Sequence, residues 1–243
     1  MAYERANPEK ALTALEESRR ELESLTYTIA HDLRAPLRTI DGFARALSED
    51  CAQELDEAGR RYLQHVLDAA QRMSGMLEGL LSLTRIQRAE FHRVSLDLAT
   101  TARDVVERLR AAEPSRAVEV VMPAAIAAEG DPSLSTNALE ALLQNAWKFT
   151  RGRDPARIEV GVKPASPRVY FVRDNGVGFD MSYAGKLFGP FQRLHSEREF
   201  EGVGIGLAAA HRIIRRHGGR IWAEAALNGG ATFYFTLEGP EAV

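Results

Sequence analysis

The stretch TIAHDLRAPLRTIDGFARAL, residues 28–47, determines the fold of the first part of the chain. Its apolar residues recur every three or four positions, and the same spacing starts at Leu12, which is typical of one long amphipathic helix. After the polar stretch 48–59, a second apolar stripe runs from Tyr62 to about Ile86. The sequence therefore predicts a helical hairpin.

One hairpin has too few neighbours to bury both of its apolar stripes. Pairing with a second copy of the chain would bury them in a dimeric four-helix bundle, so we expect a homodimer. A hairpin that packs only on the rest of its own chain is the alternative.

The composition excludes several classes of protein. Among 243 residues, 31 lysines and arginines stand against 34 acidic residues, and the net charge of -3 gives no sign of binding to nucleic acid or to a membrane surface. Cys51 is the single cysteine, which rules out an internal disulfide and favours a reducing compartment. The sequence has no apolar run near the ~20 residues of a membrane span and no signal-peptide pattern, so we expect a cytoplasmic protein.

Beyond residue 93 the pattern changes to that of an α/β domain. Short strand-like runs alternate with helical stretches, which predicts a mixed five-stranded sheet with three helices on one face. The strand-like runs are 118–122, 157–162, 168–174, 219–225 and 231–237, and the helical stretches are 99–112, 132–149 and 205–217. The predicted domains are thus a helical hairpin over 1–93 and an α/β domain over 94–243, with the boundary near Arg93.

His31 is predicted to face water. At 100° per residue it lies almost opposite the apolar stripe of the first helix, and Arg34 and Arg38 point in nearly the same direction. An imidazole in water is partly uncharged near neutral pH and can act as a nucleophile, while the carboxylate of Asp32 can accept a hydrogen bond from its other ring nitrogen. An ordinary solvated surface histidine is the alternative.

Pro36 lies inside the same helix. A proline in a helix interior costs roughly 3 kcal/mol and removes one backbone donor, and it can bend the helix just beyond His31. We interpret it as a point of flexure next to the histidine. The alternative is that it only shapes the bundle.

The second domain carries residue types that suit a nucleotide site. In QNAWKFT, residues 144–150, Asn145 and Lys148 lie three residues apart near a helix end. There an amide oxygen can ligate magnesium and an ammonium group can neutralise phosphate. Solvated or capping side chains are the alternative.

A glycine turn follows the strand-like run that ends at Asp174. In RDNGVGFDM, residues 173–181, this short acid can accept from an exocyclic amine such as that of adenine. Gly176 and Gly178 allow the backbone to approach a ligand closely, because they have no Cβ. A simple Asp-Asn-Gly turn is the alternative.

Three more glycines precede an amphipathic helix in GVGIGLAAAHRIIRRHGG, residues 202–219. The amides of a helix that starts after Gly202, Gly204 and Gly206 can hold phosphates. The pattern is not a Rossmann fingerprint, because the preceding HSEREFE is polar and charged rather than a strand.

The segment before these glycines, residues 181–203, is predicted to form a mobile cover. It carries the apolar anchors Phe188 and Phe191 and the basic residue Arg193. We expect it to close over a bound nucleotide.

Five motifs, in the order HDLRAPLR, NAWKFT, DNGVGFDM, LFGPFQRLH and EGVGIGLA, resemble the transmitter core of sensor histidine kinases, especially those attached to bacterial phytochromes. The resemblance covers roughly residues 12–237. It implies a dimerization and histidine-phosphotransfer hairpin followed by an ATP-binding α/β sandwich of the gyrase type. It also implies autophosphorylation from Mg-ATP, phosphoryl transfer to an aspartate of a response regulator, and an upstream sensor domain.

The resemblance implies a role for each candidate residue. His31 would be the phosphoacceptor, Asp32 its acid-base partner, and Asn145 the ligand of Mg²⁺. The implied ATP contacts are Lys148 on phosphate, Asp174 on the adenine amine, Gly176 and Gly178 beside the base, Phe188, Phe191 and Arg193 in the cover, and Gly202, Gly204 and Gly206 around the triphosphate.

Three positions depart from the family pattern. Ala35 stands where a threonine or asparagine often positions water for dephosphorylation of the regulator. Ala141 stands where a second asparagine is frequent, one turn before the magnesium ligand. Val203 stands where a threonine is common between the glycines, so a hydroxyl is lost and the backbone amides remain.

Two other functions fit parts of the pattern. A dimeric scaffold would bind nucleotide without transferring phosphate, but it would have no use for both His31 and Asp32. A gyrase-type ATPase without phosphohistidine would need a carboxylate that activates water, and the helix of Asn145 offers only Glu140.

Overall fold

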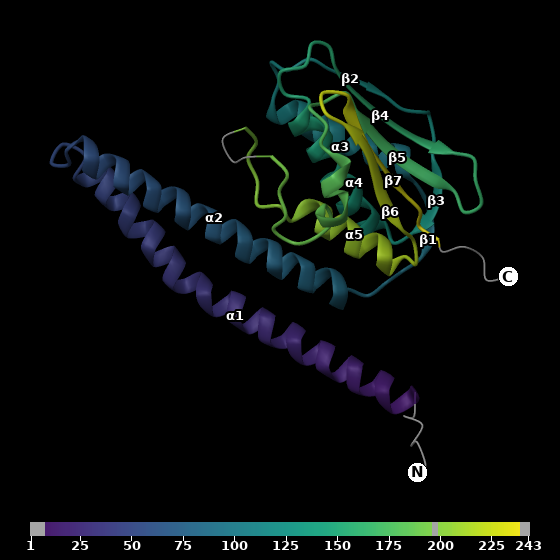
Figure 1. Ribbon diagram of the computed structural model, residues 1–243, viewed down its shortest axis with the longest axis horizontal. Helices are drawn as coiled ribbons and strands as arrows, with labels where there is room; N and C mark the ends of the chain where they lie inside the picture. Colours follow the sequence, from purple (N-terminus) through teal and green to yellow (C-terminus); the bar gives the residue numbers. More distant parts are fainter. Residues whose placement is uncertain (1–7, 196–198, 239–243) are drawn as a thin grey trace. The chain divides into compact units, whose positions relative to one another are not determined.

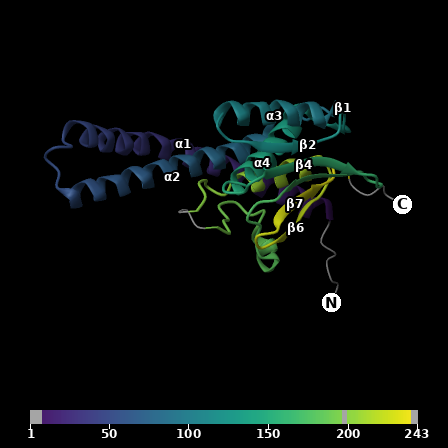
Figure 2. The ribbon, with the colours of Figure 1, turned by 90° about the horizontal axis from the view of Figure 1, so that it is seen from above.

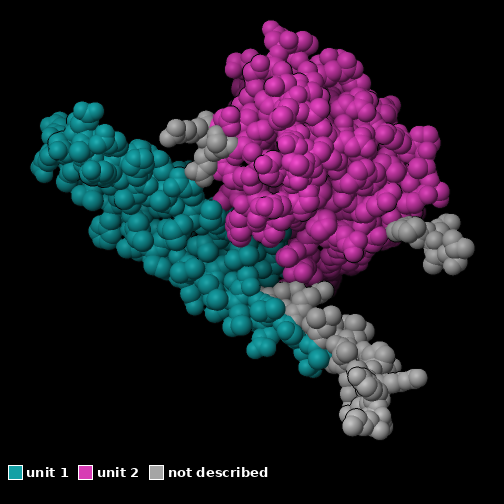
Figure 3. All heavy atoms as spheres, in the orientation of Figure 1, with its two compact units in different colours: residues 1–84 teal, residues 85–243 magenta. Residues whose placement is uncertain are grey.

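The computed structural model describes residues 8–195 and 199–238. The chain divides into two compact units, residues 1–84 and 85–243 (Figure 3). The first is helical, and the second contains the β-strands (Figure 1). No helix among the described residues is long and apolar enough to span a membrane.

The first unit is built from two long helices joined by a short turn, as predicted. α1 (Pro8–Asp50) runs through Pro36 without a break, so the proline does not end the helix. α2 (Glu57–Arg88) starts where the side chain of Asp56 accepts a hydrogen bond from the backbone N–H of Gly59 at 2.7 Å. The last turn of α2 belongs to the second compact unit. Flexure beside His31 stays a prediction.

The apolar stripe of α1 is exposed in the single chain. Ala30, Leu37 and Ala44 are buried, whereas the stripe residues keep between 43% and 69% of their surface exposed. The exposed stripe consists of Leu22, Leu25, Ile29, Leu33, Ile40, Phe43 and Leu47, and α2 adds Tyr62, Val66 and Met73. An apolar surface of this extent is typical of an interface, which favours pairing over a hairpin covered by its own chain. The side chains of Leu12 and Leu15 lie outside the described part.

The second unit is built on a five-stranded mixed sheet with the strand order β2-β4-β5-β7-β6. β2 and β4 are parallel, and the other neighbours are antiparallel. The strands are β2 (Val118–Val121), β4 (Ala156–Lys163), β5 (Val169–Asp174), β6 (Ile221–Ala226) and β7 (Gly230–Phe235). The helices α3 (Leu98–Ala112), α4 (Pro132–Phe149) and α5 (Gly206–Arg216) lie on one face of the sheet (Figure 1, Figure 2), as predicted.

Three elements are absent from the sequence prediction. β1 (Val94–Asp97) pairs with β3 (Ala127–Gly130) in a separate two-stranded antiparallel sheet. A 3-10 helix, η1 (Met181–Lys186), lies at the start of the cover segment, residues 181–203. Each of the two strands has four residues and lacks a run of β-branched residues such as the VEVV of β2, which is equally short but was predicted.

α4 is the central helix of the second unit, because it packs against α3, α5 and β5. Asp131 caps its N-terminus by accepting from the N–H of Leu134 at 2.9 Å, and Pro132 occupies its first position. Leu142 and Leu143 in its middle are fully buried. This packing fixes the direction in which the C-terminal end of α4 presents its side chains.

A buried cluster of hydrogen bonds fastens the chain around Arg93 to this unit. The imidazole of His217 accepts from the backbone N–H of Asp131 at 3.0 Å through Nε2, and its Nδ1 lies 2.9 Å from the carbonyl of Ile213. Asp131 also accepts from the N–H of His92 at 2.9 Å, and Arg93 donates to the carbonyl of His217 at 2.6 Å. Bending of the chain at Arg93 would have to break these contacts.

Burial lowers the pKa of His217 below its usual value of 6.5. An unfolded histidine therefore binds a proton at a higher pH than the folded one, so we expect the free energy of unfolding to fall as the pH drops below about 6.5. The substitution His217→Gln should flatten this dependence, measured by urea unfolding between about pH 7.5 and 5.5.

The substitution His92→Gln is the matched control, because that imidazole is 71% exposed. Burial also lowers the pKa of His211. This residue is present in the wild type and in both variants, so its contribution to the pH dependence of stability cancels when they are compared. Equal pH slopes in the wild type and in His217→Gln would contradict the prediction.

Candidate functional site

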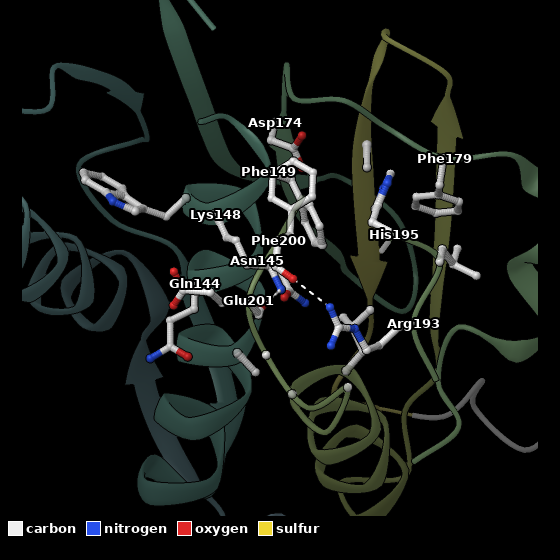
Figure 4. Close-up of a pocket in the computed structure, with 18 of the residues that line it drawn as sticks. Gln144, Asn145, Lys148, Phe149, Asp174, Phe179, Arg193, His195, Phe200 and Glu201 are labelled. Carbon is white, nitrogen blue, oxygen red and sulfur yellow. Dashed lines mark hydrogen bonds between the residues drawn. The ribbon is translucent and has the colours of Figure 1, made fainter. Parts of the chain in front are cut away.

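A cavity of about 580 Å³ opens beside the C-terminal half of α4 (Figure 4). Its walls are α4, the turn after β5, β7 and the cover segment, of which residues 196–198 lie outside the described residues. The predicted site residues that line it are Asn145, Lys148, Asp174, Gly178, Arg193, Gly202, Gly204 and Gly206. The fold thus brings motifs from distant parts of the sequence to one site.

Lys148 is the basic residue that α4 contributes to the cavity wall. Lys148 Nζ donates to the backbone carbonyl of Glu201 in the cover segment at 3.1 Å. Burial lowers the pKa of Lys148, and the positive charges of Arg193 and Arg151 act in the same direction. The charge of Glu201 opposes this shift, and Arg151 pairs with Glu113 at 2.9 Å. Lys148 and Arg193 are therefore the cations that favour an anionic ligand such as phosphate beside Asn145.

Asp174 lies at the end of β5, where only 5% of its surface is exposed. Burial raises the pKa of its carboxyl group to about 6, although hydrogen bonds from the backbone N–H groups of Gly176 and Ala231 oppose the shift. The N–H of Gly176 lies 2.8 Å from Oδ1. A buried carboxylate has four lone-pair sites, so this one can still accept an N–H group from a ligand.

Both glycines after Asp174 are required by close packing. A Cβ on Gly178, which has a φ of +59°, would lie 1.9 Å from the carbonyl oxygen of Ala226. A Cβ on Gly176 would lie 2.4 Å from the carbonyl oxygen of Phe149 at the end of α4. Gly176 therefore does not line the cavity but lets the Asp174 turn pack directly against α4.

The later glycine turn leads into α5. Gly202 and Gly204 have φ values of +124° and +74°, which side chains rarely adopt. Gly206 is the first residue of α5, and the preceding Ile205 provides no side-chain cap. The first amides of this helix are thus left for a ligand or water, and they face the same cavity as Lys148.

Phe188 and Phe191, which were predicted to contact the nucleotide, do not line the cavity. Phe188 stacks on His211 of α5 with ring centroids 5.6 Å apart. Phe191 is 39% exposed, and its N–H donates to the carbonyl of Gly204 at 2.9 Å. These residues fasten the cover segment to α5 and to the glycine turn, and a contact of either with nucleotide stays a prediction.

An aromatic cluster in the cavity was missed by the sequence motifs. The rings of Phe149, His195 and Phe200 lie with centroids between 4.9 and 5.4 Å apart, and Phe179 lines the wall nearby (Figure 4). The three clustered residues come from the end of α4 and from two separated parts of the cover segment. No regular spacing relates them, so the sequence offers no signal for their meeting.

His31 is exposed on α1, as the helical periodicity predicts. Its side chain is 61% exposed, and its Nδ1 lies 3.2 Å from Oδ1 of Asp32. Consecutive residues of a helix do not normally face each other, so this contact depends on side-chain rotamers that the sequence does not specify. When Nδ1 donates to the carboxylate, Nε2 keeps its lone pair.

The fold and the site define a nucleotide-binding α/β domain preceded by a helical hairpin that displays a histidine. Residues 130–241 match the family described as histidine kinase-, DNA gyrase B- and HSP90-like ATPase. Residues 21–89 match the His Kinase A (phospho-acceptor) domain. The chain therefore contains a domain of each of these two families, the phospho-acceptor domain first and the ATPase domain second.

Characterised relatives support this assignment. Cyanobacterial phytochrome B of Nostoc sp. is 32% identical over 230 residues, which cover 92% of this chain. The methanogenesis regulatory histidine kinase FilI of Methanothrix harundinacea is 35% identical over 227 residues, which cover 90% of this chain. The chain spans 30% and 25% of the lengths of these two relatives.

Solved structures share the fold. The histidine kinase AdeS of Acinetobacter baumannii is similar with a TM-score of 0.59 and 18% identity, over 86% of this chain and 97% of that one. Full-length ShkA, solved in complex with AMPPNP, is similar with a TM-score of 0.60 and 22% identity, over 90% of this chain and 47% of that one. At these identities the similarity shows the fold alone.

Asp174 should lower the stability of the ligand-free protein. Its pKa is raised on folding, so the folded state loses stability relative to the unfolded state as the pH rises from 3.8 through about 6. The substitution Asp174→Asn, which keeps an acceptor for Gly176, should raise the free energy of unfolding at about pH 7.5 by about 1 to 3 kcal/mol. Urea unfolding measures the difference.

The gain should shrink at about pH 4.5, where the folded wild type holds this carboxyl group neutral. Asp104→Asn, at an exposed position on α3, is the matched control and should change little. A less stable Asp174→Asn protein at neutral pH would contradict the prediction, because it would show that hydrogen bonds in the folded protein offset the cost of burying the carboxylate.

Proposed function

We propose that this chain is the kinase core of a sensor histidine kinase of a two-component system. It autophosphorylates His31 from Mg-ATP and passes the phosphoryl group to an aspartate of a response regulator. The observation that carries the proposal is one cavity lined by Asn145, Lys148 and Asp174, in a chain that also exposes a paired His31 and Asp32. The two matching domain families support the same function.

In this proposal, ATP is recognised at both of its ends. The adenine amine donates to the buried carboxylate of Asp174, with the backbone of Gly178 beside the base. The phosphates lie toward Lys148, Arg193 and the first amides of α5, where positive charge and free N–H groups converge. The cover segment excludes water from this end of the site.

Asn145 is the residue that would hold Mg²⁺. The described residues contain no group of three or more His, Cys, Asp or Glu side chains able to bind a metal, so phosphate oxygens and water would supply the remaining ligands. Its amide oxygen in the half-buried wall fits this use, while Ala141, one turn earlier in the same wall, offers no ligand. When bound, Mg²⁺ neutralises charge on the phosphates.

The transfer itself uses both nitrogens of His31. Nε2 attacks the γ-phosphorus in line, the N–P bond forms as the bond to the β,γ-bridging oxygen breaks, and ADP leaves. Asp32 holds the proton of Nδ1 and stabilises the positive charge that develops on the ring. In the second step an aspartate of the regulator attacks the phosphorus and the imidazole leaves.

We also propose a homodimer and a functional division at Arg93. The exposed stripe of α1 and the exposed apolar residues of α2 supply the dimer surface. Residues 1–93 serve dimerization and phosphotransfer, and residues 94–243 bind ATP. An upstream sensor domain and a response regulator are the expected partners.

Two other functions have less support. An ATPase would use Glu140 to activate water, but this carboxylate lies 3.4 Å from Arg108, accepts from Gln144 at 3.4 Å and does not line the cavity. A scaffold without transfer would have no use for the contact between His31 and Asp32.

The proposed function is tested by incubating the protein with γ-labelled ATP and Mg²⁺. We expect a label that is stable in base and lost in acid, as for a phosphoramidate, and that is absent from His31→Gln. Persistence of the label in this variant, or a label that survives acid, would overturn the assignment of His31.

A second variant separates nucleotide binding from folding. Asn145→Ala should abolish labelling and leave the oligomeric state unchanged, because Asn145 lies in the cavity wall and not on the stripe of α1. Loss of dimerization in Asn145→Ala would count against the two-domain division.

The dimer surface is tested with Phe43→Glu. Phe43 is 69% exposed in the single chain, so a charge there should not disturb the hairpin but should be buried in a dimer, at a cost of several kcal/mol. We expect light scattering to report a monomer. Glu49→Lys, at an exposed position about 120° around α1 from Phe43, is the control and should remain dimeric. A dimeric Phe43→Glu protein would place the interface elsewhere.

A further inference from the structure

The cover segment is tied directly to the turn that carries Asp174. His195 lies in this segment, and its Nε2 is 3.0 Å from the backbone carbonyl oxygen of Gly178. A carbonyl oxygen only accepts, so Nε2 carries the proton and donates to it. The two groups line the same cavity as Asp174.

The ring of His195 is also held by packing. Its centroid lies 5.2 Å from that of Phe149 at an interplanar angle of 45°, and 5.4 Å from that of Phe200 at 64°. Arg193 donates to the carbonyl of Phe200 at 2.7 Å, which draws together the two ends of this part of the cover (Figure 4). The imidazole therefore has little freedom to swing away from Gly178.

The acceptor is equally fixed. Gly178 packs so closely on the carbonyl of Ala226 that a Cβ would not fit, and the neighbouring Val177 accepts from the N–H of Asn228 at 2.7 Å. His195 thus binds the cover to a turn that is itself held by contacts with Ala226 and Asn228.

A second contact between the cover and the domain uses Lys148, which the proposed function assigns to phosphate. Lys148 donates to the carbonyl of Glu201, and Arg151 lies 3.7 Å from the carboxylate of the same residue. In the proposed function Lys148 turns to phosphate when ATP binds. The contact between His195 and Gly178 involves no phosphate-binding group, so it can persist in the occupied site.

We propose that His195 is a positioning residue that latches the cover segment to the Asp174 turn and so retains the bound adenine nucleotide. This inference rests on the proposed function, because it assumes that the cavity binds ATP. The latch is the hydrogen bond to Gly178, and the aromatic packing with Phe149 and Phe200 holds the donor in line.

Two substitutions separate the hydrogen bond from the packing. His195→Phe keeps an aromatic ring between Phe149 and Phe200 but has no donor. His195→Gln loses the ring but keeps an amide N–H at a similar distance from the backbone. His92→Phe changes an exposed histidine outside the cavity and serves as the control.

The readout is the dissociation rate of a fluorescent ATP analogue from the full chain with Mg²⁺, followed by stopped flow after a chase with ATP. A neutral hydrogen bond changes an equilibrium by about two- to tenfold, so His195→Phe should release the analogue about two to ten times faster than the wild type. His195→Gln should stay close to the wild-type rate, and His92→Phe should match it. The rate of phosphorylation of His31 at saturating ATP should match the wild-type rate in the control His92→Phe.

Hydrogen exchange gives an independent readout. With nucleotide bound, amides of the cover segment should exchange faster in His195→Phe than in the wild type, while the thermal unfolding midpoints of the two proteins should agree. If His195→Phe is unstable, His195→Leu, which also lacks a donor, takes its place.

Wild-type release rates in His195→Phe, or equally fast release from His195→Gln and His195→Phe, would overturn the latch. In both cases the wild type would still bind the analogue, so the proposed function would stand. A wild-type chain that binds no analogue would overturn the proposed function, and the latch with it.

Discussion

The burial of one carboxylate determines the architecture of the site. Asp174 ends β5, which lies in the interior of the sheet between β4 and β7, so its position is fixed by strands on both sides. The glycines that follow allow backbone to pack against backbone, which keeps water away from the carboxyl group and raises its pKa to about 6. In the proposed function, the cost of this burial is offset when the nucleotide supplies a donor, and this difference between the free and bound states is the basis of recognition.

The proposed function would place its two chemical tasks in opposite environments. Asp174 is nearly inaccessible, which suits the proposed recognition of a base, since water does not replace the hydrogen bonds there. His31 is largely exposed, which suits a proposed nucleophile that two different phosphoryl partners have to reach. The division of the chain into two compact units allows each residue to have the surroundings that its role requires.

The sequence predicts those features that depend on local periodicity or on short motifs. The two long helices, the five strands of the main sheet and the site residues Asn145, Lys148 and Asp174 belong to this group, since each is specified by its immediate neighbours in the chain. The pair β1 and β3 was not predicted, because these short strands lack the run of β-branched residues that identifies the equally short β2. The cover segment is irregular, so its sequence does not specify that Phe188 turns to α5 while His195 and Phe200 turn into the cavity. Such directions depend on tertiary contacts.

The buried cluster around His217 constrains how this sequence can change over time. The imidazole of His217 accepts from the backbone N–H of Asp131 and packs edge-on against the ring of Phe91. A Cβ on Gly130 would come within 2.9 Å of its Nε2. The start of α4, the end of α5 and the chain leading from α2 therefore share one set of contacts. In related sequences we therefore expect a substitution at one of these positions to be accompanied by substitutions at the positions that contact it.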